Sequence, residues 1–450
     1  MSVPVTGNGD GRHHVVIVGC GFGGLFAAKA LKRKPVRVTV IDRTNHHLFQ
    51  PLLYQVATGI LSEGQIAPAI RDVLRNHRSL NVVLADVVRI DTEARVVHAD
   101  EFGEPLAIGY DSLIVAGGST TSYFGHDEFR AYASGMKSLD DALALRGQIF
   151  GAFERAEAET DETVRRDLMT FVVIGGGPTG VEMAGQLVEL SHRALRRNYR
   201  RINPGSARVV LVEGGDRLVA SMGARLSRIT ARDLGRLGVE IHLGAMVTDL
   251  DDRGVVITKR DGGVVRIDAD TRIWAAGTRA SGLGALLSDA PGVELDKSGR
   301  VVVAPDCSLP GHPEVFVVGD LMALDDLPGV AEVAMQSGAH AAHTIVRRLE
   351  GQPPKPFRYR DLGTLAVISR FRAVAEVGPI RVGGFAGWLL WLVVHITFLT
   401  GFKNRFGALA RWAVSFIGRG RYERALTGRW VARAGRSDGA DGADGVDGSA

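Results

Sequence analysis

Two glycine-rich turns in this chain have the residue spacing of phosphate-binding loops. The first turn follows a short apolar run, precedes a helical stretch and contains Gly19, Gly21, Phe22, Gly23 and Gly24. In a G-x-G-x-x-G turn the first glycine permits a tight bend, the second admits a pyrophosphate, and the third allows the helix to pack closely on the strand. Free N–H groups and the dipole at the start of that helix would hold the phosphates of a dinucleotide.

An acidic residue completes the pattern of this first site. Asp42 ends the next expected strand, 23 residues after Gly19, where its carboxylate can accept hydrogen bonds from ribose hydroxyls. We assign Arg43, Gln50 and Gly117 to the same cofactor site. The competing interpretation is a glycine-rich turn in an unrelated α/β protein, but here the strand, the helix and the terminal acid occur together.

A second turn repeats the arrangement and contains Gly175, Gly177, Pro178, Thr179 and Gly180. Glu213 ends the following strand, 38 residues after the first of these glycines, and a long basic helix expected over 181–201 accounts for the spacing. A carboxylate at this position accepts from a 2′-hydroxyl and repels a 2′-phosphate, which favours NADH over NADPH, although Arg217 lies nearby. Gly277, at the end of a later strand, is assigned to the same site.

Glu182 lies just inside the helix that follows the second turn. Its side chain could reach a bound nicotinamide, or it could neutralise the N-terminal dipole of the helix. The position in the sequence leaves both possibilities open.

The two turns belong to two copies of one strand–turn–helix–strand pattern. The expected strands cover 14–18 and 36–41 in the first copy and 171–174 and 209–212 in the second. We therefore expect an α/β fold with two Rossmann-like dinucleotide-binding domains and a C-terminal helical membrane-anchoring segment. The expected boundaries are 12–125 and 300–350 for the first domain, 126–299 for the second, 351–430 for the anchor region and 434–450 for a disordered tail.

The composition excludes several classes of protein. Cys20 and Cys307 are the two cysteines among 450 residues and form no CxxC pair, which excludes a disulfide framework, a structural zinc site and dithiol redox chemistry. We expect no metal, since no His, Cys or Asp cluster has ligand spacing. Ten Lys and Arg residues against one acid between Arg381 and Arg436 could face nucleic acid or anionic lipid. The apolar run inside that segment favours lipid, so we expect no nucleic-acid partner.

That apolar run covers residues 382–402 and has 21 positions without a formal charge. It could be a transmembrane helix, a monotopic anchor in the membrane interface or a buried core helix. We rank the core helix last because Trp388, Trp391 and flanking basic residues are typical of a membrane interface. A second stretch, 406–417, has the pattern of an interfacial helix.

Together these features resemble the type II NADH:quinone oxidoreductases, the single-subunit, non-proton-pumping NADH dehydrogenases among the two-dinucleotide-binding-domain flavoproteins. The resemblance rests on specific motifs in three stretches, 47–59, 177–182 and 328–336. It implies FAD in the first domain, NADH in the second, and transfer of a hydride to FAD and then of electrons to a quinone. It also implies a homodimer on the inner face of the cytoplasmic membrane.

The resemblance assigns roles to individual residues as well. It implies that Asp320 contacts the flavin ribityl chain, that Glu182 lies beside the nicotinamide, and that Gln336 lies near the quinone edge of the flavin. One residue departs from the pattern, because Glu332 stands where the family commonly has a glutamine. An ionised carboxylate accepts but cannot donate to a quinone carbonyl, whereas a buried and protonated carboxyl could donate.

Other functions are compatible with parts of the sequence. The protein could pass electrons to a protein acceptor such as ferredoxin, although the apolar C-terminal region speaks against this. A sulfide:quinone oxidoreductase is disfavoured because that chemistry needs several active-site cysteines. The non-enzymatic alternative is a membrane-tethered redox sensor that binds FAD and NADH and turns over slowly.

Overall fold

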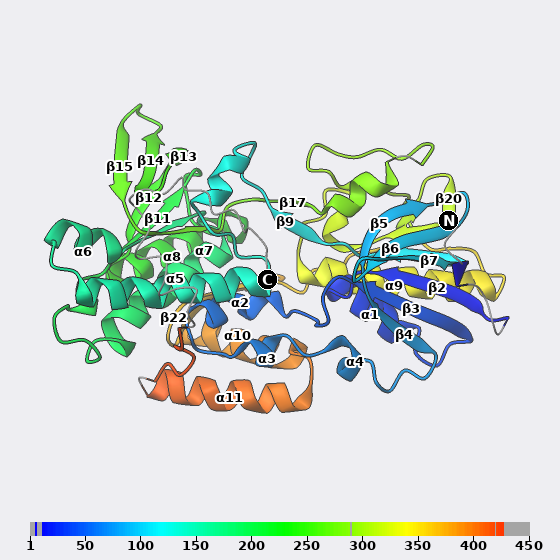
Figure 1. The fold of residues 1–450 in the computed structure, drawn as a ribbon, viewed down its shortest axis with the longest axis horizontal. Coiled ribbons are helices and arrows are strands. Elements are labelled where there is room, and N and C mark those ends of the chain that lie inside the picture. The colour runs from blue at the N-terminus through cyan, green and yellow to red at the C-terminus, as the bar shows by residue number, and fades with distance from the viewer. Residues whose placement is uncertain (1–4, 7–10, 289, 419, 427–450) are drawn as a thin grey trace, which may run out of the picture.

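The computed structural model of the protein describes residues 5–6, 11–288, 290–418 and 420–426. It consists of two α/β lobes placed side by side, with a layer of C-terminal helices along one side (Figure 1). The tail predicted at 434–450 lies outside the described residues.

The first lobe is built on a six-stranded sheet that combines residues far apart in the chain. Its strands, in spatial order, are β19 (Ser308–Leu309), β20 (His312–Val317), β8 (Ser112–Val115), β2 (His13–Val18), β3 (Val36–Asp42) and β4 (Leu80–Leu84). Every neighbouring pair is parallel except β19 and β20. The continuous β-branched runs are buried, as expected for strands that are covered on both faces.

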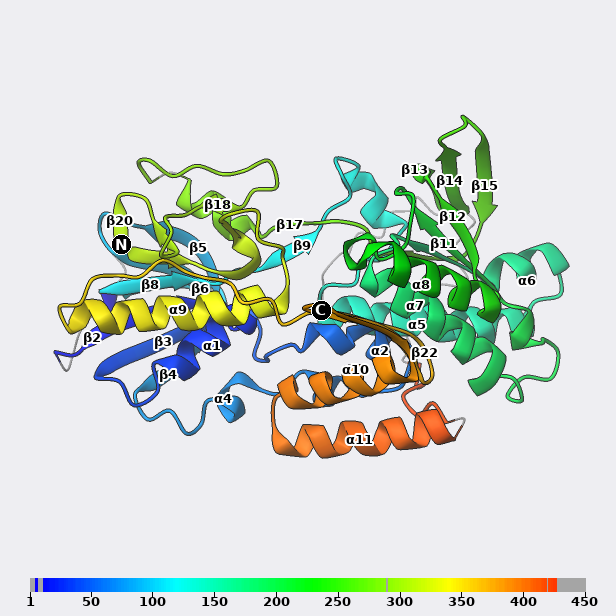
Figure 2. The ribbon, with the colours of Figure 1, turned by 180° about the vertical axis from the view of Figure 1, so that it is seen from behind.

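Two helices that are far apart in the sequence pack on this sheet (Figure 2), and smaller elements complete the lobe. Helices α1 (Phe22–Ala30) and α9 (Ala331–Leu349) lie so close together that a Cβ atom on Gly338 would overlap the carbonyl oxygen of Gly23. The remaining elements of this lobe are β1 (Val5–Thr6), β5 (Asp86–Asp91), β6 (Val96–Glu101), β7 (Glu104–Gly109), β18 (Val301–Val302), β21 (Met322–Ala323) and α4 (Ile70–Val73). Two short helices, α2 (Leu53–Ala57) and α3 (Glu63–Ile66), pack instead on the second lobe and on the C-terminal layer.

The second lobe repeats the parallel architecture with a four-stranded sheet. Its parallel strands, in spatial order, are β12 (Glu240–Leu243), β11 (Arg208–Glu213), β10 (Thr170–Ile174) and β16 (Thr271–Trp274). Its helices are α5 (Leu139–Ala158), α6 (Glu162–Leu168), α7 (Pro178–Glu189) and α8 (Gly223–Leu237). Strands β9 (Ser119–Thr121) and β17 (Thr278–Ala280) pair between the two lobes (Figure 1).

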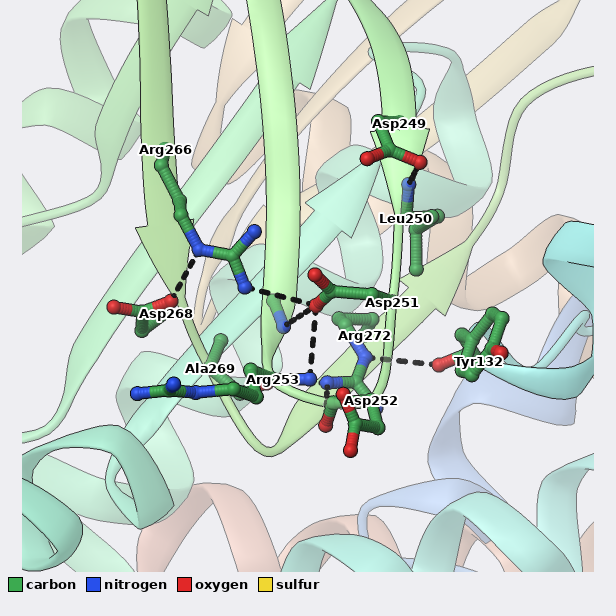
Figure 3. Close-up of polar contacts among 11 residues, drawn as sticks. Tyr132, Asp249, Leu250, Asp251, Asp252, Arg253, Arg266, Asp268, Ala269 and Arg272 are labelled. Carbon is green, nitrogen blue, oxygen red and sulfur yellow. Dashed lines mark hydrogen bonds and ion pairs between the residues drawn. The ribbon is translucent and has the colours of Figure 1, made fainter.

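An antiparallel sheet projects from the second lobe and is held at its base by an arginine (Figure 3). Its strands are β13 (Ala245–Leu250), β14 (Gly254–Lys259) and β15 (Val264–Asp268). The buried Arg272 guanidinium donates to the backbone oxygens of Tyr132, Asp252 and Ala269, at 2.9, 2.9 and 2.7 Å. These bonds connect β16 with the loop before α5, with the turn between β13 and β14, and with the residue that follows β15.

The prediction of a long basic helix over 181–201 is wrong for the second half of that range. Helix α7 ends at Glu189 and continues only as a π-helical turn, Leu190–Ala194. Beyond that turn the sequence is dominated by arginines and has no regular apolar face to bury. The chain turns instead, and the Glu157 carboxylate accepts hydrogen bonds from the backbone N–H groups of residues 200–202.

The C-terminal region contains three strands followed by two helices. The first two strands are β22 (Thr364–Ser369) and β23 (Arg372–Val377). A third strand, β24 (Ile380–Gly384), contains the first residues of the apolar run 382–402. Helices α10 (Phe385–Phe398) and α11 (Phe402–Ile417) follow. The 21-residue run is thus a strand end and a 14-residue helix rather than one continuous helix. Within the described residues, no helix is both long and apolar enough to span a bilayer.

One face of these helices belongs to the core, so the core-helix interpretation that we ranked last holds for that face. Trp388, Trp391 and His395 of α10 are buried, as is Trp412 of α11. The rings of Trp391 and Trp412 lie 5.1 Å apart. Burial removes apolar surface from water, which accounts for the docking of this layer on the lobes.

One basic residue of the expected lipid-facing cluster is also buried. Arg421 is 5% exposed and donates from Nη2 to Oε1 of Gln186 at 2.8 Å. Arg411 forms an ion pair with Glu423 at 3.0 Å, and Arg405 donates to the carbonyl oxygens of Thr397 and Leu399. The positive charge available at the surface is therefore smaller than the sequence count indicates.

Candidate functional site

A large cavity lies between the two lobes and collects most of the predicted residues of the first site. Its volume is about 1060 Å³, and both lobes contribute to its wall. The predicted site residues that line it are Gly19, Gly21, Phe22, Gly23, Asp42, Arg43, Gln50, Gly117, Thr179, Glu182 and Asp320. Residues from the chain positions 19 to 320 therefore meet at one place.

The first glycine-rich turn has the backbone geometry that its spacing predicted. Gly19 has φ +91°, a left-handed conformation that glycine adopts readily, and a Cβ atom there would lie 2.5 Å from the carbonyl oxygen of Ala116. A Cβ atom on Gly24 would overlap the carbonyl oxygen of Gly19. A Cβ atom on Gly21, in contrast, would meet no protein atom within 4 Å. The turn is closed on its protein side and open at Gly21, which fits a pyrophosphate approaching the backbone.

Asp42 is held rigidly at the wall of the cavity. Its Oδ2 accepts from the backbone N–H of Cys20 at 2.6 Å. Its Oδ1 accepts from the backbone N–H and the hydroxyl of Thr44, at 2.7 and 2.8 Å. A carboxylate can accept about four hydrogen bonds, so capacity remains for a ribose hydroxyl.

The second turn has the same backbone arrangement as the first. Gly175 has φ +110°, and a Cβ atom on Gly180 would overlap the carbonyl oxygen of Gly175. Glu213 accepts from the backbone N–H groups of Gly176 and Gly215, at 2.5 and 2.6 Å. Both turns therefore bind an acidic side chain from the adjacent strand end.

Most residues of this second turn do not line the cavity. Only Thr179 of the second turn contributes to its wall, so the assignment of Gly175, Gly177, Pro178, Gly180 and Glu213 to a cofactor remains a prediction. Gly277 also lies outside the cavity wall, and a Cβ atom there would overlap the ring of Phe124. A packing requirement alone explains a glycine at that position.

Glu182 is buried on α7 with its side chain at the cavity. It is 7% exposed, and Oε1 accepts from the backbone N–H of Val367 at 3.2 Å. Burial raises the pKa of Glu182 well above its usual range, although the hydrogen bond from Val367 opposes the shift. The first turn of α7 contains no acidic residue, so Glu182 lies too far along the helix to act mainly on its dipole. A protonated carboxyl here can donate a hydrogen bond into the cavity.

A half-buried lysine at the cavity was not anticipated from the sequence. Lys137 Nζ donates to the Ser119 hydroxyl at 3.2 Å, and that hydroxyl donates to Oδ2 of Asp320 at 2.7 Å. The Gln50 side-chain amide donates to the carbonyl oxygen of Lys137 at 2.8 Å. Burial lowers the pKa of Lys137, and the negative charge of Asp320 opposes this shift. Neither Lys137 nor Ser119 belongs to a motif that sequence inspection could have identified.

The two residues predicted at the quinone site lie on α9 but not on the wall of this cavity. Gln336 donates from Nε2 to the carbonyl oxygen of Arg360 at 2.9 Å and accepts from its backbone N–H at 3.0 Å. Burial raises the pKa of Glu332, one turn earlier. Their roles toward a quinone remain predictions.

Comparison with known proteins identifies the family. Residues 13–338 match the family described as pyridine nucleotide-disulphide oxidoreductase. The type II NADH:quinone oxidoreductase Ndh of Mycobacterium tuberculosis is 50% identical over 419 residues, which cover 92% of this chain and 90% of the relative. NdhA from the same organism is 49% identical over 426 residues, covering 94% and 91%. The chain belongs to the type II NADH:quinone oxidoreductases.

This membership confirms the predicted family, the NADH dehydrogenase activity, and FAD and NADH as the cofactors of the type II enzyme. A solved structure of NDH2 from Plasmodium falciparum in complex with NADH has a TM-score of 0.85 and 20% identity, covering 91% of this chain and 99% of that one. That similarity confirms the predicted α/β fold with Rossmann-like sheets.

The cysteines of the type II enzyme are unsuited to sulfide chemistry. A sulfide:quinone oxidoreductase from Aquifex aeolicus shares the fold, with a TM-score of 0.68 at 17% identity, 90% coverage of this chain and 95% of that one. Cys20 and Cys307 are both buried here. Burial raises the pKa of Cys307 to about 12 and also raises that of Cys20, so neither thiol is a ready nucleophile.

Proposed function

We propose that the first turn holds FAD and the second holds NADH, with their reacting rings meeting in the cavity between the lobes. The observation that carries this proposal is the pair of matched turns, each with a strand-end carboxylate, together with the cavity that is lined by the first turn and by Thr179 and the buried Glu182 of α7. When bound, FAD takes two electrons and a proton from NADH and passes the electrons to a quinone.

The protein residues orient the cofactors and control protons at this site. Asp42, fixed by Cys20 and Thr44, would accept from a ribose hydroxyl of FAD. Glu213 would do the same for NADH and would repel the 2′-phosphate of NADPH. The protonated Glu182 would donate a hydrogen bond at the reaction centre.

Steady-state oxidation by the purified protein tests this function. The protein loaded with FAD is expected to oxidise NADH in the presence of a soluble quinone at tens per second, an ordinary enzyme rate, and to use NADPH poorly. Reduction of a ferredoxin in preference to a quinone would indicate a protein acceptor, and very slow turnover would indicate a sensor.

We further propose that α10 and α11 attach the enzyme peripherally to the inner face of the cytoplasmic membrane. Large apolar side chains on both helices are exposed to solvent: Phe385, Leu389, Val393, Phe406, Leu409 and Val414. Exposed apolar groups beside basic residues are typical of segments that lie in a membrane interface. This arrangement would place the enzyme where an apolar quinone dissolves.

The homodimer implied by the family resemblance is also part of the proposal. Light scattering of the detergent-solubilised protein is expected to give twice the mass of the 48.1 kDa chain.

A further inference from the structure

A chain of hydrogen bonds connects helix α11 with the wall of the cavity. The indole Nε1 of Trp412 donates to Oε1 of Gln55 at 2.6 Å. The Nε2 of Gln55 donates to the hydroxyl oxygen of Tyr54 at 3.0 Å. All three side chains are buried, with 2% of Trp412, 1% of Gln55 and 2% of Tyr54 exposed. Tyr54, like Glu182, lines the cavity.

Trp412 determines the direction of every bond in this chain. An indole N–H can only donate, so the carbonyl end of the Gln55 amide must face Trp412. The NH₂ end of the amide must then face Tyr54, whose oxygen accepts. The O–H proton of Tyr54 is consequently left over, and among the described residues no acceptor for it is found.

A buried hydroxyl that donates no hydrogen bond is unfavourable, so the proton needs an acceptor from outside the protein. The cavity is the open space that Tyr54 adjoins. The charged and titratable groups near the hydroxyl are Glu182, Glu189 and Arg421. Burial raises the pKa of Tyr54 well above its usual range, so the hydroxyl keeps its proton throughout the working pH range.

We infer that the Tyr54 hydroxyl donates a hydrogen bond to a carbonyl oxygen of a cofactor in the cavity, and that Gln55 is the positioning residue through which Trp412 of α11 sets its direction. This inference rests on the proposed function of the cavity. It means that the C-terminal helical layer acts on the reaction site through Trp412, which lies 357 positions from Gln55 in the sequence, in addition to its proposed role at the membrane surface.

Matched tryptophan variants test the connection. Trp412→Phe and Tyr54→Phe are each expected to lower kcat for NADH oxidation about tenfold, which corresponds to one hydrogen bond. The double variant should be no slower than Tyr54→Phe alone. Trp391→Phe is the control, because Trp391 is equally buried beside Trp412 but its indole N–H has no hydrogen-bond partner among the described residues. Its rate should be unchanged.

Gln55→Glu separates positioning from packing. A protonated carboxyl can accept from Trp412 and donate to Tyr54, as the amide does, whereas an ionised carboxylate can only accept and would draw the Tyr54 proton away from the cavity. The rate of this variant relative to the wild-type rate at the same pH should therefore fall as the pH rises through the pKa of the introduced carboxyl. Any titration of Glu182 is common to both proteins and cancels in this ratio.

Flavin absorption provides a readout that does not depend on turnover. If the acceptor is a flavin carbonyl, Tyr54→Phe and Trp412→Phe will shift the visible band of the FAD-loaded protein equally, without NADH. If the acceptor is the nicotinamide carboxamide, the shift will appear only when NAD⁺ is added. No shift under either condition, additive losses in the double variant, or an equal loss in Trp391→Phe would overturn the inference. Failure of the wild-type protein to reduce a quinone would instead count against the proposed function, and the spectra would still decide the hydrogen bond.

Discussion

Glu182 makes the stability of the folded protein depend on pH. Its pKa is raised by burial above the ordinary value of 4.5, so between these two values the folded chain binds a proton that the unfolded chain has lost. This contribution to stability is complete below pH 4.5 and is lost as the pH rises through the folded pKa, at about 1.4 kcal/mol per pH unit.

We therefore expect the Tm of Glu182→Gln minus the Tm of the wild type to increase as the pH is raised from about 5 to 9. The wild-type carboxyl loses its stabilising proton over this range, whereas the amide does not titrate. Thermal unfolding of the FAD-loaded proteins at a series of pH values measures this difference. A constant difference in Tm would mean that the wild-type carboxyl is ionised throughout.

Glu332 provides a second residue-scale prediction, which concerns only the quinone half of the reaction. Glu332→Gln is expected to change the KM for quinone and to leave reduction of the flavin by NADH almost unaffected, because a neutral amide donates at every pH. Stopped-flow reduction by NADH and steady-state quinone kinetics separate the two steps. Equal losses in both would place Glu332 away from the quinone.

At the scale of elements, a substitution in either glycine-rich turn should impair the binding of one cofactor and leave the binding of the other. Gly24→Ala would push a methyl group into the Gly19 carbonyl and is expected to abolish the yellow colour of the purified protein. Gly180→Ala should keep FAD but raise the KM for NADH more than about tenfold, a cost of about 1.4 kcal/mol or more in binding. Absorption spectra and NADH titrations measure both effects.

Gly64→Ala is the control for these substitutions. Gly64 lies exposed on α3, and a Cβ atom there meets nothing within 4 Å. Cofactor loss in all three variants would indicate general unfolding rather than a blocked turn.

The base of the projecting sheet makes another element-scale prediction (Figure 3). Arg272→Ala would leave three carbonyl oxygens without their donor and should destabilise the second lobe by about 3 kcal/mol. Arg266→Ala, in the same sheet, removes ion pairs with Asp251 and Asp268 that are about 40% exposed and should cost only about 0.5 kcal/mol. Thermal unfolding compares the two, and equal losses would contradict the assigned role of Arg272.

At the scale of the whole molecule, the exposed faces of α10 and α11 are expected to carry the membrane interaction. The combined change Leu389→Ser, Val393→Ser and Phe406→Ser should reduce co-sedimentation with anionic phospholipid vesicles, because it removes apolar area that would insert between the lipids. NADH oxidation with a soluble quinone should stay the same. Phe102→Ser, which removes an 82% exposed ring in the turn between β6 and β7, is the control.

The sequence was sufficient to predict the geometry of the two glycine-rich turns, because that geometry depends on neighbouring residues alone. Gly19 and Gly175 have the left-handed φ values, and Asp42 and Glu213 the strand-end positions, that the spacing predicted. The same reasoning failed for 181–201 and 382–402, where charge and hydropathy alone do not say where a helix ends. Those ends depend on contacts such as the Glu157 carboxylate and on the pairing of β24 with β23.

By itself, then, the sequence determined the α/β fold with Rossmann-like sheets, since short β-branched runs and glycine spacings act over a few neighbouring residues. The motifs in 47–59, 177–182 and 328–336 indicated the family and, with it, FAD and NADH. Only the tertiary structure decided which side chains meet: Ser119 with Asp320, 201 positions apart, and Gln55 with Trp412, 357 positions apart. Hydrogen bonds of this kind leave no periodic pattern in the chain, because each depends on one donor and one acceptor that the packing of whole elements brings within 3 Å.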